Sequence, residues 1–188
     1  YKCNRFAVAG PQDDVVWPDY SRLMDYELEL ACVIGRRGRD IEASRAREHI
    51  FGYTIFNDFS ARDAQANEME GPFGPAKGKD FDGANVFGPC IVTRDEIPDP
   101  YALTMRAAVN GSERVRGSTA TMHWTFEQMI EHVSRGETLY PGEILGSGTV
   151  GNGCGLESLS FLREGDVVEL EIERIGTLRN RVVRGGGL

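Results

Sequence analysis

The feature that most constrains the fold is an apolar run at residues 25–35 that carries two acidic side chains. Its leucines, cysteine, valine and isoleucine predict a buried strand. Because successive side chains of a strand point to opposite faces, Glu27 and Glu29 share one face, while Leu28 and Leu30 share the other. With a rise of about 3.3 Å per residue, the two glutamates leave the backbone only about 6.6 Å apart.

Two carboxylates this close repel each other and resist burial unless a positive charge neutralises them. A divalent cation would do so, whereas an exposed polar face on an edge strand is the alternative for Glu27 and Glu29. Asp58 follows the predicted strand at 50–57 and is the best candidate for a third ligand, because it can point into a cleft. A turn or helix-capping aspartate is its alternative. Three such carboxylates would suit Mg²⁺, Mn²⁺ or Ca²⁺.

The composition is that of a globular protein with a single domain, which we place at residues 1–188. Forty per cent of the residues are hydrophobic, 27% are charged and 23 of 188 are glycine; the usual glycine content is about 7%, so tight turns and strands are favoured. A net charge of −8 argues against nucleic acid or an anionic membrane as partner. No apolar run reaches the roughly 20 residues of a membrane span. Four cysteines without a CxxC pair predict reduced thiols in a cytoplasmic protein.

The periodicity along the chain indicates an α+β, β-rich fold. Besides the strand at 50–57, alternation predicts a strand at 167–172, and Asn110-Gly111 predicts a hairpin.

Three short helices are expected between these strands. One covers about 41–49 with Asp40 as its N-cap, and a second begins at a Ser60-x-x-Asp63 capping signature. The third begins after Thr125, which a glutamine follows three residues later, as in a capping box.

A glycine-rich loop at 146–155 indicates backbone that must approach another group closely. It contains a GxGxxG spacing, but the glycines and asparagine that follow cannot build the helix that a dinucleotide site requires. Thr149 offers a hydroxyl to an anion there, and Lys79 offers an ammonium group, with a solvated surface lysine as its alternative. The three histidines lack the short spacing of metal ligands; they are His49, His123 and His132.

Several segments resemble the fumarylacetoacetate hydrolase family. They are DYELEL at 25–30, GYTIFNDFSARDAQ at 52–65, GPAKGKDF at 74–81, GSGT at 146–149, GDVV at 165–168 and IGTLRN at 175–180. Their order and spacing are similar to the family's over almost the whole chain. The resemblance implies the rolled mixed β-sheet fold of the family's C-terminal catalytic domain, and a homodimer.

The resemblance also implies functional roles. The metal ligands would be Glu27, Glu29 and Asp58, binding Mg²⁺, Mn²⁺ or Ca²⁺. The catalytic residues would be Lys79, Gln65 and Thr149, and the substrate-binding residues would be Arg62 and Lys2. Family members normally carry an upstream lid segment with a catalytic histidine. None precedes Tyr1 in this sequence, so we expect the lid and the general base to lie outside it.

The implied reaction is hydrolysis of a C–C bond in a small β-dicarbonyl or 2-oxo acid, with a divalent metal polarising the carbonyl. Decarboxylation or keto–enol isomerisation of a 2-oxo acid at the same site is the first alternative. A non-catalytic, ligand-binding member of the family is the second.

Overall fold

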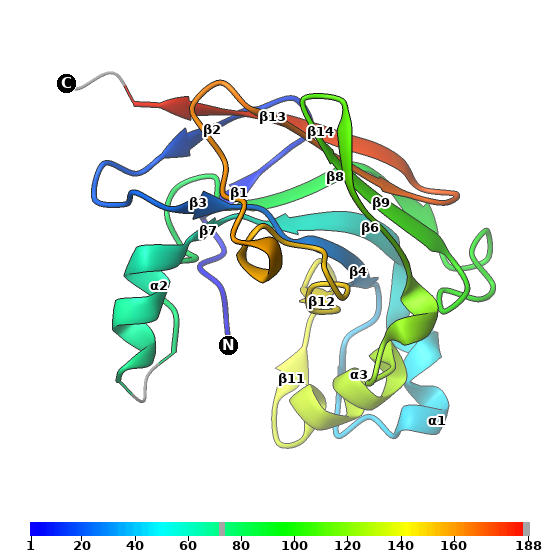
Figure 1. The fold of residues 1–188 in the computed structure, drawn as a ribbon. Helices are drawn as coiled ribbons and strands as arrows, with labels where there is room; N and C mark the ends of the chain where they lie inside the picture. The colour runs from blue at the N-terminus through cyan, green and yellow to red at the C-terminus, as the bar shows by residue number, and fades with distance from the viewer. Residues whose placement is uncertain (72–73, 186–188) are drawn as a thin grey trace.

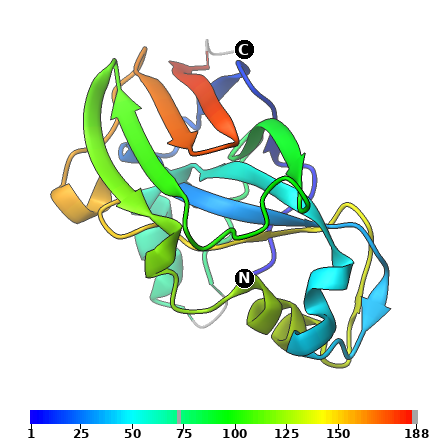
Figure 2. The ribbon, with the colours of Figure 1, turned by 90° about the vertical axis from the view of Figure 1, so that its right-hand side faces the viewer.

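The computed structural model describes residues 1–71 and 74–185 and contains two curled five-stranded sheets (Figure 1). The first sheet runs in the order β1 (Val8–Ala9), β8 (Asn85–Thr93), β6 (Ile50–Asp58), β4 (Leu28–Ile34) and β12 (Ile144–Gly146). The second runs in the order β10 (Ser112–Ser118), β9 (Thr104–Val109), β13 (Val167–Ile172), β14 (Gly176–Arg184) and β2 (Asp14–Trp17). Figure 2 shows the second sheet lying over the first.

Both sheets are mixed. Strands β1 and β8 pair in parallel, as do β14 and β2, and the remaining pairs of the two large sheets are antiparallel. Two small two-stranded sheets flank them. They are formed by β11 (Thr138–Leu139) with β5 (Gly38–Arg39), and by β3 (Met24–Asp25) with β7 (Ser60–Ala61). The β-rich α+β fold with rolled mixed sheets is therefore confirmed.

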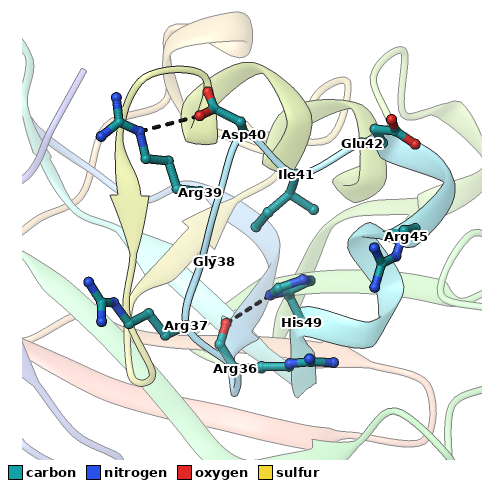
Figure 3. A pocket seen from close by; sticks show the side chains of 9 residues that line it. All are labelled: Arg36, Arg37, Gly38, Arg39, Asp40, Ile41, Glu42, Arg45 and His49. Carbon is teal, nitrogen blue, oxygen red and sulfur yellow. Dashed lines mark hydrogen bonds and ion pairs between the residues drawn. The ribbon is translucent and has the colours of Figure 1, made fainter.

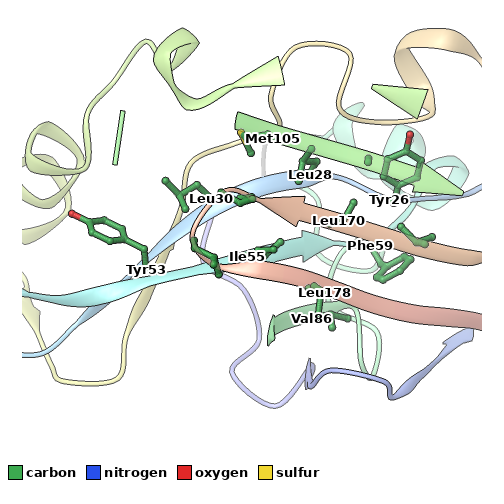
Figure 4. Packing of buried hydrophobic residues seen from close by; sticks show 14 of the residues in the cluster. Tyr26, Leu28, Leu30, Tyr53, Ile55, Phe59, Val86, Met105, Leu170 and Leu178 are labelled. Carbon is green, nitrogen blue, oxygen red and sulfur yellow. The ribbon is translucent and has the colours of Figure 1, made fainter. Parts of the chain in front are cut away.

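The core fills the space between the two large sheets (Figure 4). Leu28, Leu30 and Ile55 face it from the first sheet, and Leu170 and Leu178 from the second; each of them is 1% exposed or less. Strand β4 is buried along its whole length, because its opposite face is covered as well. The predicted apolar run thus forms a central strand, and the edge-strand alternative for its glutamates is wrong.

Helices are few and short. They are α1 (Ala43–Ala46), α2 (Arg62–Met69) and α3 (Phe126–Ser134), with 3-10 turns η1 (Arg47–His49), η2 (Thr119–Thr121) and η3 (Leu156–Ser158). Helix α3 has the predicted capping box: Thr125 accepts a hydrogen bond from the N–H of Gln128, whose side chain accepts one from the N–H of Thr125. The hairpin at Asn110-Gly111 is confirmed between β9 and β10.

Two capping predictions are wrong. Asp40 lies in a left-handed conformation (φ 51°) and accepts a hydrogen bond from the N–H of Gly136 at 2.7 Å, so α1 begins only after Glu42. Ser60 belongs to strand β7, and its hydroxyl donates to the carbonyl of Asp58. Helix α2 therefore begins at Arg62 without a side-chain cap.

We expect Thr125→Ala to lower the free energy of unfolding by about 1 kcal/mol, because the first turn of α3 loses its side-chain acceptor. Thr125→Ser keeps the hydroxyl oxygen and serves as the matched control. Urea unfolding of the two variants beside the parent measures the difference, and equal stability of Thr125→Ala and Thr125→Ser would contradict the role of the cap.

Candidate metal centre

Strand register brings three carboxylates to one face of the first sheet. In the antiparallel pair β4–β6, Glu29 lies opposite Phe56, so both side chains point to the same side. Asp58 lies two residues beyond Phe56 and points to that side too. Leu28 and Leu30 point to the opposite side, into the core.

Glu27 lies just before β4, where it forms an isolated bridge with Cys154. Its N–H donates to the side-chain oxygen of Asn57 at 3.1 Å, which fixes the backbone beside the end of β6. One carboxylate oxygen each of Glu27, Glu29 and Asp58 lies within 4.8 Å of the others. The three residues are only 8%, 4% and 4% exposed. Three converging buried carboxylate oxygens form a donor set that fits a hard divalent cation.

Lys79 contacts two of these carboxylates. Its ammonium nitrogen lies 2.9 Å from Oε2 of Glu27 and 2.7 Å from Oδ2 of Asp58, and the residue is 3% exposed. A buried ammonium ion at this distance can be retained only because the carboxylates pair with it. The structure therefore excludes the solvated-surface alternative for Lys79.

Arg62 is the second buried cation of the cluster. One terminal guanidinium nitrogen lies 2.7 Å from Oε1 of Glu27 and 2.8 Å from Oδ2 of Asp25. The other donates to the amide oxygen of Gln65 at 2.9 Å. The guanidinium group thus holds Glu27 and orients Gln65, whose amide NH₂ donates to no other residue that the structure describes.

Sequence reasoning missed Asp25, which is fully buried. Its carboxylate accepts hydrogen bonds from the N–H groups of Gly155 at 2.7 Å and Leu156 at 2.9 Å, and from Nε of Arg62 at 2.8 Å. It therefore joins the glycine-rich loop to Arg62. The signal was its parity in the predicted strand at 25–35, where Asp25 lies two residues before Glu27, although the structure places Asp25 on the separate strand β3.

The buried cluster contains more acidic than basic side chains. Four carboxylates are buried in the part of the chain that the structure describes, and all belong to this cluster, with two cations to balance them. Burial, then the charges of Asp58 and Glu27, raise the pKa of Glu29 well above its usual range. Burial raises the pKa of Asp58 to about 6, although Lys79 opposes the rise. A divalent cation would balance the four ionised carboxylates.

The pKa of Glu27 shifts in the opposite direction from those of Glu29 and Asp58. The burial of Glu27 opposes ionisation, but the charges of Lys79 and Arg62 outweigh that effect and lower its pKa. Glu27 is therefore the carboxylate of the three that stays ionised most readily, and it anchors the cluster to both cations.

The glycine-rich loop is shaped around Glu29. The N–H of Gly148 donates to Oε2 of Glu29 at 3.0 Å. A Cβ atom on Gly146 would lie 2.5 Å from the same oxygen and 2.9 Å from the ring of Phe56, so no larger residue fits there without moving the carboxylate. This close approach is the reason for at least one glycine of the loop.

Two other residues predicted to act at the site, Thr149 and Lys2, lie outside the carboxylate cluster. Thr149 follows Gly148 and lines a cavity beside the loop. Lys2 is placed elsewhere in this structure: its side chain is 84% exposed and pairs with Glu137 at 2.5 Å. Tyr1 reaches the cluster instead, with its hydroxyl donating to Oδ2 of Asp58 at 3.2 Å. A substrate contact for Lys2 stays a prediction.

A second cavity, of about 310 Å³, lies at the basic turn between β4 and α1 (Figure 3). Four arginines line it, and acids face three of them: Arg36 and Arg45 approach Glu48 at 3.5 Å, and Arg39 approaches Asp40 at 3.3 Å. None of the predicted catalytic or metal-binding residues lines it. We assign no function to this cavity.

A model described as fumarylacetoacetate (FAA) hydrolase C-terminal matches residues 1–183. A curated relative, oxaloacetate tautomerase FAHD2A, mitochondrial, from Bos taurus, is 40% identical over 178 residues, which are 94% of this chain and 56% of the relative. The chain thus spans little more than half the length of that relative. Because that relative is named as mitochondrial, the cytoplasmic location stays a prediction.

Two solved structures share the fold. The 5-carboxymethyl-2-hydroxymuconate delta-isomerase from Mycobacterium smegmatis has a TM-score of 0.86 and 37% identity, covering 97% of this chain and 67% of that one. The fumarylpyruvate hydrolase from Pseudomonas aeruginosa, in complex with Mn²⁺ and pyruvate, has a TM-score of 0.86 and 27% identity. That match covers 95% of this chain and 76% of the hydrolase chain.

Among the described residues, no helix has the length and apolar character to cross a membrane. The family model covers nearly the whole chain, and the 40% identical relative is matched over 94% of the chain. This chain therefore belongs to the fumarylacetoacetate hydrolase family, and it corresponds to the family's C-terminal domain.

Proposed function

We propose that this chain is the metal-binding domain of an enzyme that acts on a 2-oxo acid through its enolate. The observation that carries the proposal is the convergence of Glu27, Glu29 and Asp58 in a buried cluster. Together with Asp25, these carboxylates outnumber the two buried cations, Lys79 and Arg62, and a divalent cation would balance the surplus negative charge. The bound cation would supply a Lewis acid that polarises the keto oxygen. Mn²⁺ in the fumarylpyruvate hydrolase structure supports a divalent metal, and Mg²⁺ is the expectation from carboxylate chemistry.

The protein's own side chains hold the substrate in this proposal. Lys79 presents an ammonium group to the substrate carboxylate or to the oxygen on which negative charge develops. Gln65 donates from the amide NH₂ that Arg62 orients, and Thr149 donates from its hydroxyl. The base that moves the C3 proton belongs to the upstream segment that the family resemblance implies.

Keto–enol tautomerisation is the reaction that we propose first. It moves one proton between C3 and the keto oxygen of a 2-oxo acid and needs no second substrate. The 40% identical relative named as an oxaloacetate tautomerase supports it. Hydrolysis of a C–C bond, the reaction expected from the sequence, is the second candidate, supported by the fumarylpyruvate hydrolase structure at 27% identity. In that reaction water adds to the distal carbonyl, the C–C bond breaks and the enolate leaves.

We expect Glu29→Gln to weaken Mn²⁺ binding at least about tenfold, because an anionic oxygen ligand becomes a neutral amide. Glu164 is exposed on the surface, so Glu164→Gln is the matched control and should bind Mn²⁺ like the parent. Calorimetric titration with Mn²⁺ gives the affinities. Parent-like binding by Glu29→Gln would exclude Glu29 as a ligand.

We expect Lys79→Ala to lower turnover about 100-fold in the full-length protein that contains this chain, because one preorganised donor to the developing negative charge is lost. Mn²⁺ affinity should be retained, since removing a cation leaves the carboxylates free. Lys77→Ala removes an exposed lysine two residues away and is the control.

Oxaloacetate and acetylpyruvate, supplied in parallel to the Mn²⁺-loaded full-length protein that contains this chain, separate the two reactions. Loss of the enol absorbance of oxaloacetate reports tautomerisation, and release of pyruvate from acetylpyruvate reports hydrolysis. If the parent protein binds Mn²⁺ but turns over neither compound, the chain belongs to a non-catalytic member and the proposed activity is wrong.

A further inference from the structure

Asn85 carries a buried amide that makes no hydrogen bond in this structure. The residue is 1% exposed, yet neither its amide oxygen nor its amide nitrogen has a hydrogen-bond partner within residues 1–71 and 74–185. A primary amide offers two donors and an acceptor, and taking them out of water without partners costs free energy. A buried amide of this kind therefore indicates a hydrogen bond that forms in another state of the protein.

The backbone of Asn85 is held from both sides by neighbouring strands. Strand β8 lies between β1 and β6, and in it Asn85 is opposite Val8 on one side and Asp58 on the other. The N–H of Asn85 donates to the carbonyl of Ala7 at 2.9 Å. The sheet therefore sets the direction in which the side chain of Asn85 leaves the backbone.

The register places this amide on the face of the sheet that carries the metal centre. Directly opposite residues of an antiparallel pair share a face, so the side chain of Asn85 lies on the same side as that of Asp58. Two positions along the same strands, the rings of Phe56 and Phe87 stack at 4.5 Å on that face. Val86 lies between Asn85 and Phe87 and points to the other side, into the core (Figure 4). Asn85 is thus a neighbour of the metal centre and not a core residue.

The pairing also places the side chains of Asn85 and Asp58 close to each other. The N–H of Phe59 donates to the carbonyl of Ala84 at 3.0 Å, just outside this pair. That bond identifies Asp58 and Asn85 as a non-hydrogen-bonded pair, in which the Cα atoms are about 4.5 Å apart and the side chains are closest. The amide and the carboxylate are therefore neighbours, although they share no hydrogen bond in this structure.

Asp58 has acceptor capacity that its partners in this structure leave open. Lys79 donates to Oδ2 at 2.7 Å, and the hydroxyl of Tyr1 donates to the same oxygen at 3.2 Å. Among the side chains that the structure describes, Oδ1 accepts only from the Tyr1 hydroxyl, at 3.4 Å. A carboxylate has about four lone-pair sites, so Asp58 can bind a cation through one oxygen and accept from an amide through the other.

We propose that Asn85 is a positioning residue of the metal centre, whose amide NH₂ donates to the carboxylate of Asp58 when that carboxylate binds the cation. The inference rests on the proposed function, because it takes Asp58 as a metal ligand. Ligating carboxylates are commonly held by a hydrogen bond from a group that does not touch the metal. A neutral amide suits this position, since it directs the carboxylate without the repulsion that a second positive charge, such as that of Lys79, exerts on the cation.

Two substitutions of Asn85 separate this role from a purely structural one. Asn85→Leu keeps the branching of the side chain without its polar atoms, and Asn85→Ala removes the amide without adding volume. In the full-length protein that contains this chain, we expect calorimetric titration to show Mn²⁺ binding weakened about tenfold or more in each variant. The urea midpoint of metal-free Asn85→Leu should stay close to that of the parent, because the amide has no hydrogen bond to lose.

Asn180 is the matched control, because it is a buried asparagine whose amide nitrogen is used within the fold. It is 2% exposed, and its NH₂ group donates to the carbonyls of Gly10 and Asp13 at 3.0 Å each. Asn180→Leu should therefore lower the urea midpoint and leave the Mn²⁺ affinity of the folded protein unchanged. A structural asparagine and a positioning asparagine thus give opposite patterns in the same two measurements.

The outcomes separate this inference from the proposed function. If the parent binds no Mn²⁺, the metal centre itself is wrong, and the role of Asn85 is overturned with it. If the parent binds Mn²⁺ and Asn85→Ala binds it equally tightly, the role of Asn85 is wrong while the metal centre stands.

A crystal structure of the Mn²⁺-loaded parent tests the proposal without any variant. We expect the amide nitrogen of Asn85 to lie about 2.9 Å from a carboxylate oxygen of Asp58, the usual length of such a hydrogen bond. An amide nitrogen of Asn85 beyond hydrogen-bond distance of Asp58, with Mn²⁺ bound to that residue, would overturn the proposal.

Discussion

The charge imbalance in one buried cluster is the constraint on which the site depends. Among the described residues, the four buried carboxylates of the cluster share two buried cations, Lys79 and Arg62, which pair with Asp25, Glu27 and Asp58 but not with Glu29. An unbalanced buried charge costs several kcal/mol, so such a cluster persists only where protonation or a bound cation relieves it. Raised pKa values for Glu29 and Asp58 are the sign of that unrelieved charge. A protein that needed these residues only for stability would be better served by apolar ones.

The surrounding structure is built to hold the cluster in place. The pairing of β4 with β6 sets Glu29 and Asp58 on one face, while the other face of the same strands packs into the core. Arg62 and Asp25 then tie helix α2 and the glycine-rich loop to Glu27. The carboxylates of the cluster consequently lie on or beside paired strands, an arrangement that favours precise ligand geometry. In the proposed function, the loop would supply contacts with the substrate.

Strand periodicity was sufficient to predict the acidic face, because parity is a local property of the backbone. Asp58 could be added to Glu27 and Glu29 because a carboxylate at the end of a strand can point into a cleft, with a turn or helix-capping aspartate as the alternative. Asp25 was missed because its partners are the N–H groups of Gly155 and Leu156, about 130 positions away in the sequence, and no local pattern shows such a contact.

The helix caps likewise could be predicted only where their partners are close in the sequence. Thr125 was predicted correctly because its capping box is completed within four residues. The capping predictions for Asp40 and Ser60 were wrong because both residues have tertiary partners instead. Asp40 accepts a hydrogen bond from the N–H of Gly136, and Ser60 lies in a strand in which it pairs with Asp25.

The most direct measurement is anomalous diffraction at the manganese edge from crystals of the full-length protein soaked with Mn²⁺ and oxalate. We expect one strong peak bonded to carboxylate oxygens of Glu27, Glu29 and Asp58, with oxalate on its open side and Lys79 facing the oxalate. A peak elsewhere, or an ammonium group of Lys79 still seated between Glu27 and Asp58 with no manganese beside it, would contradict the metal centre.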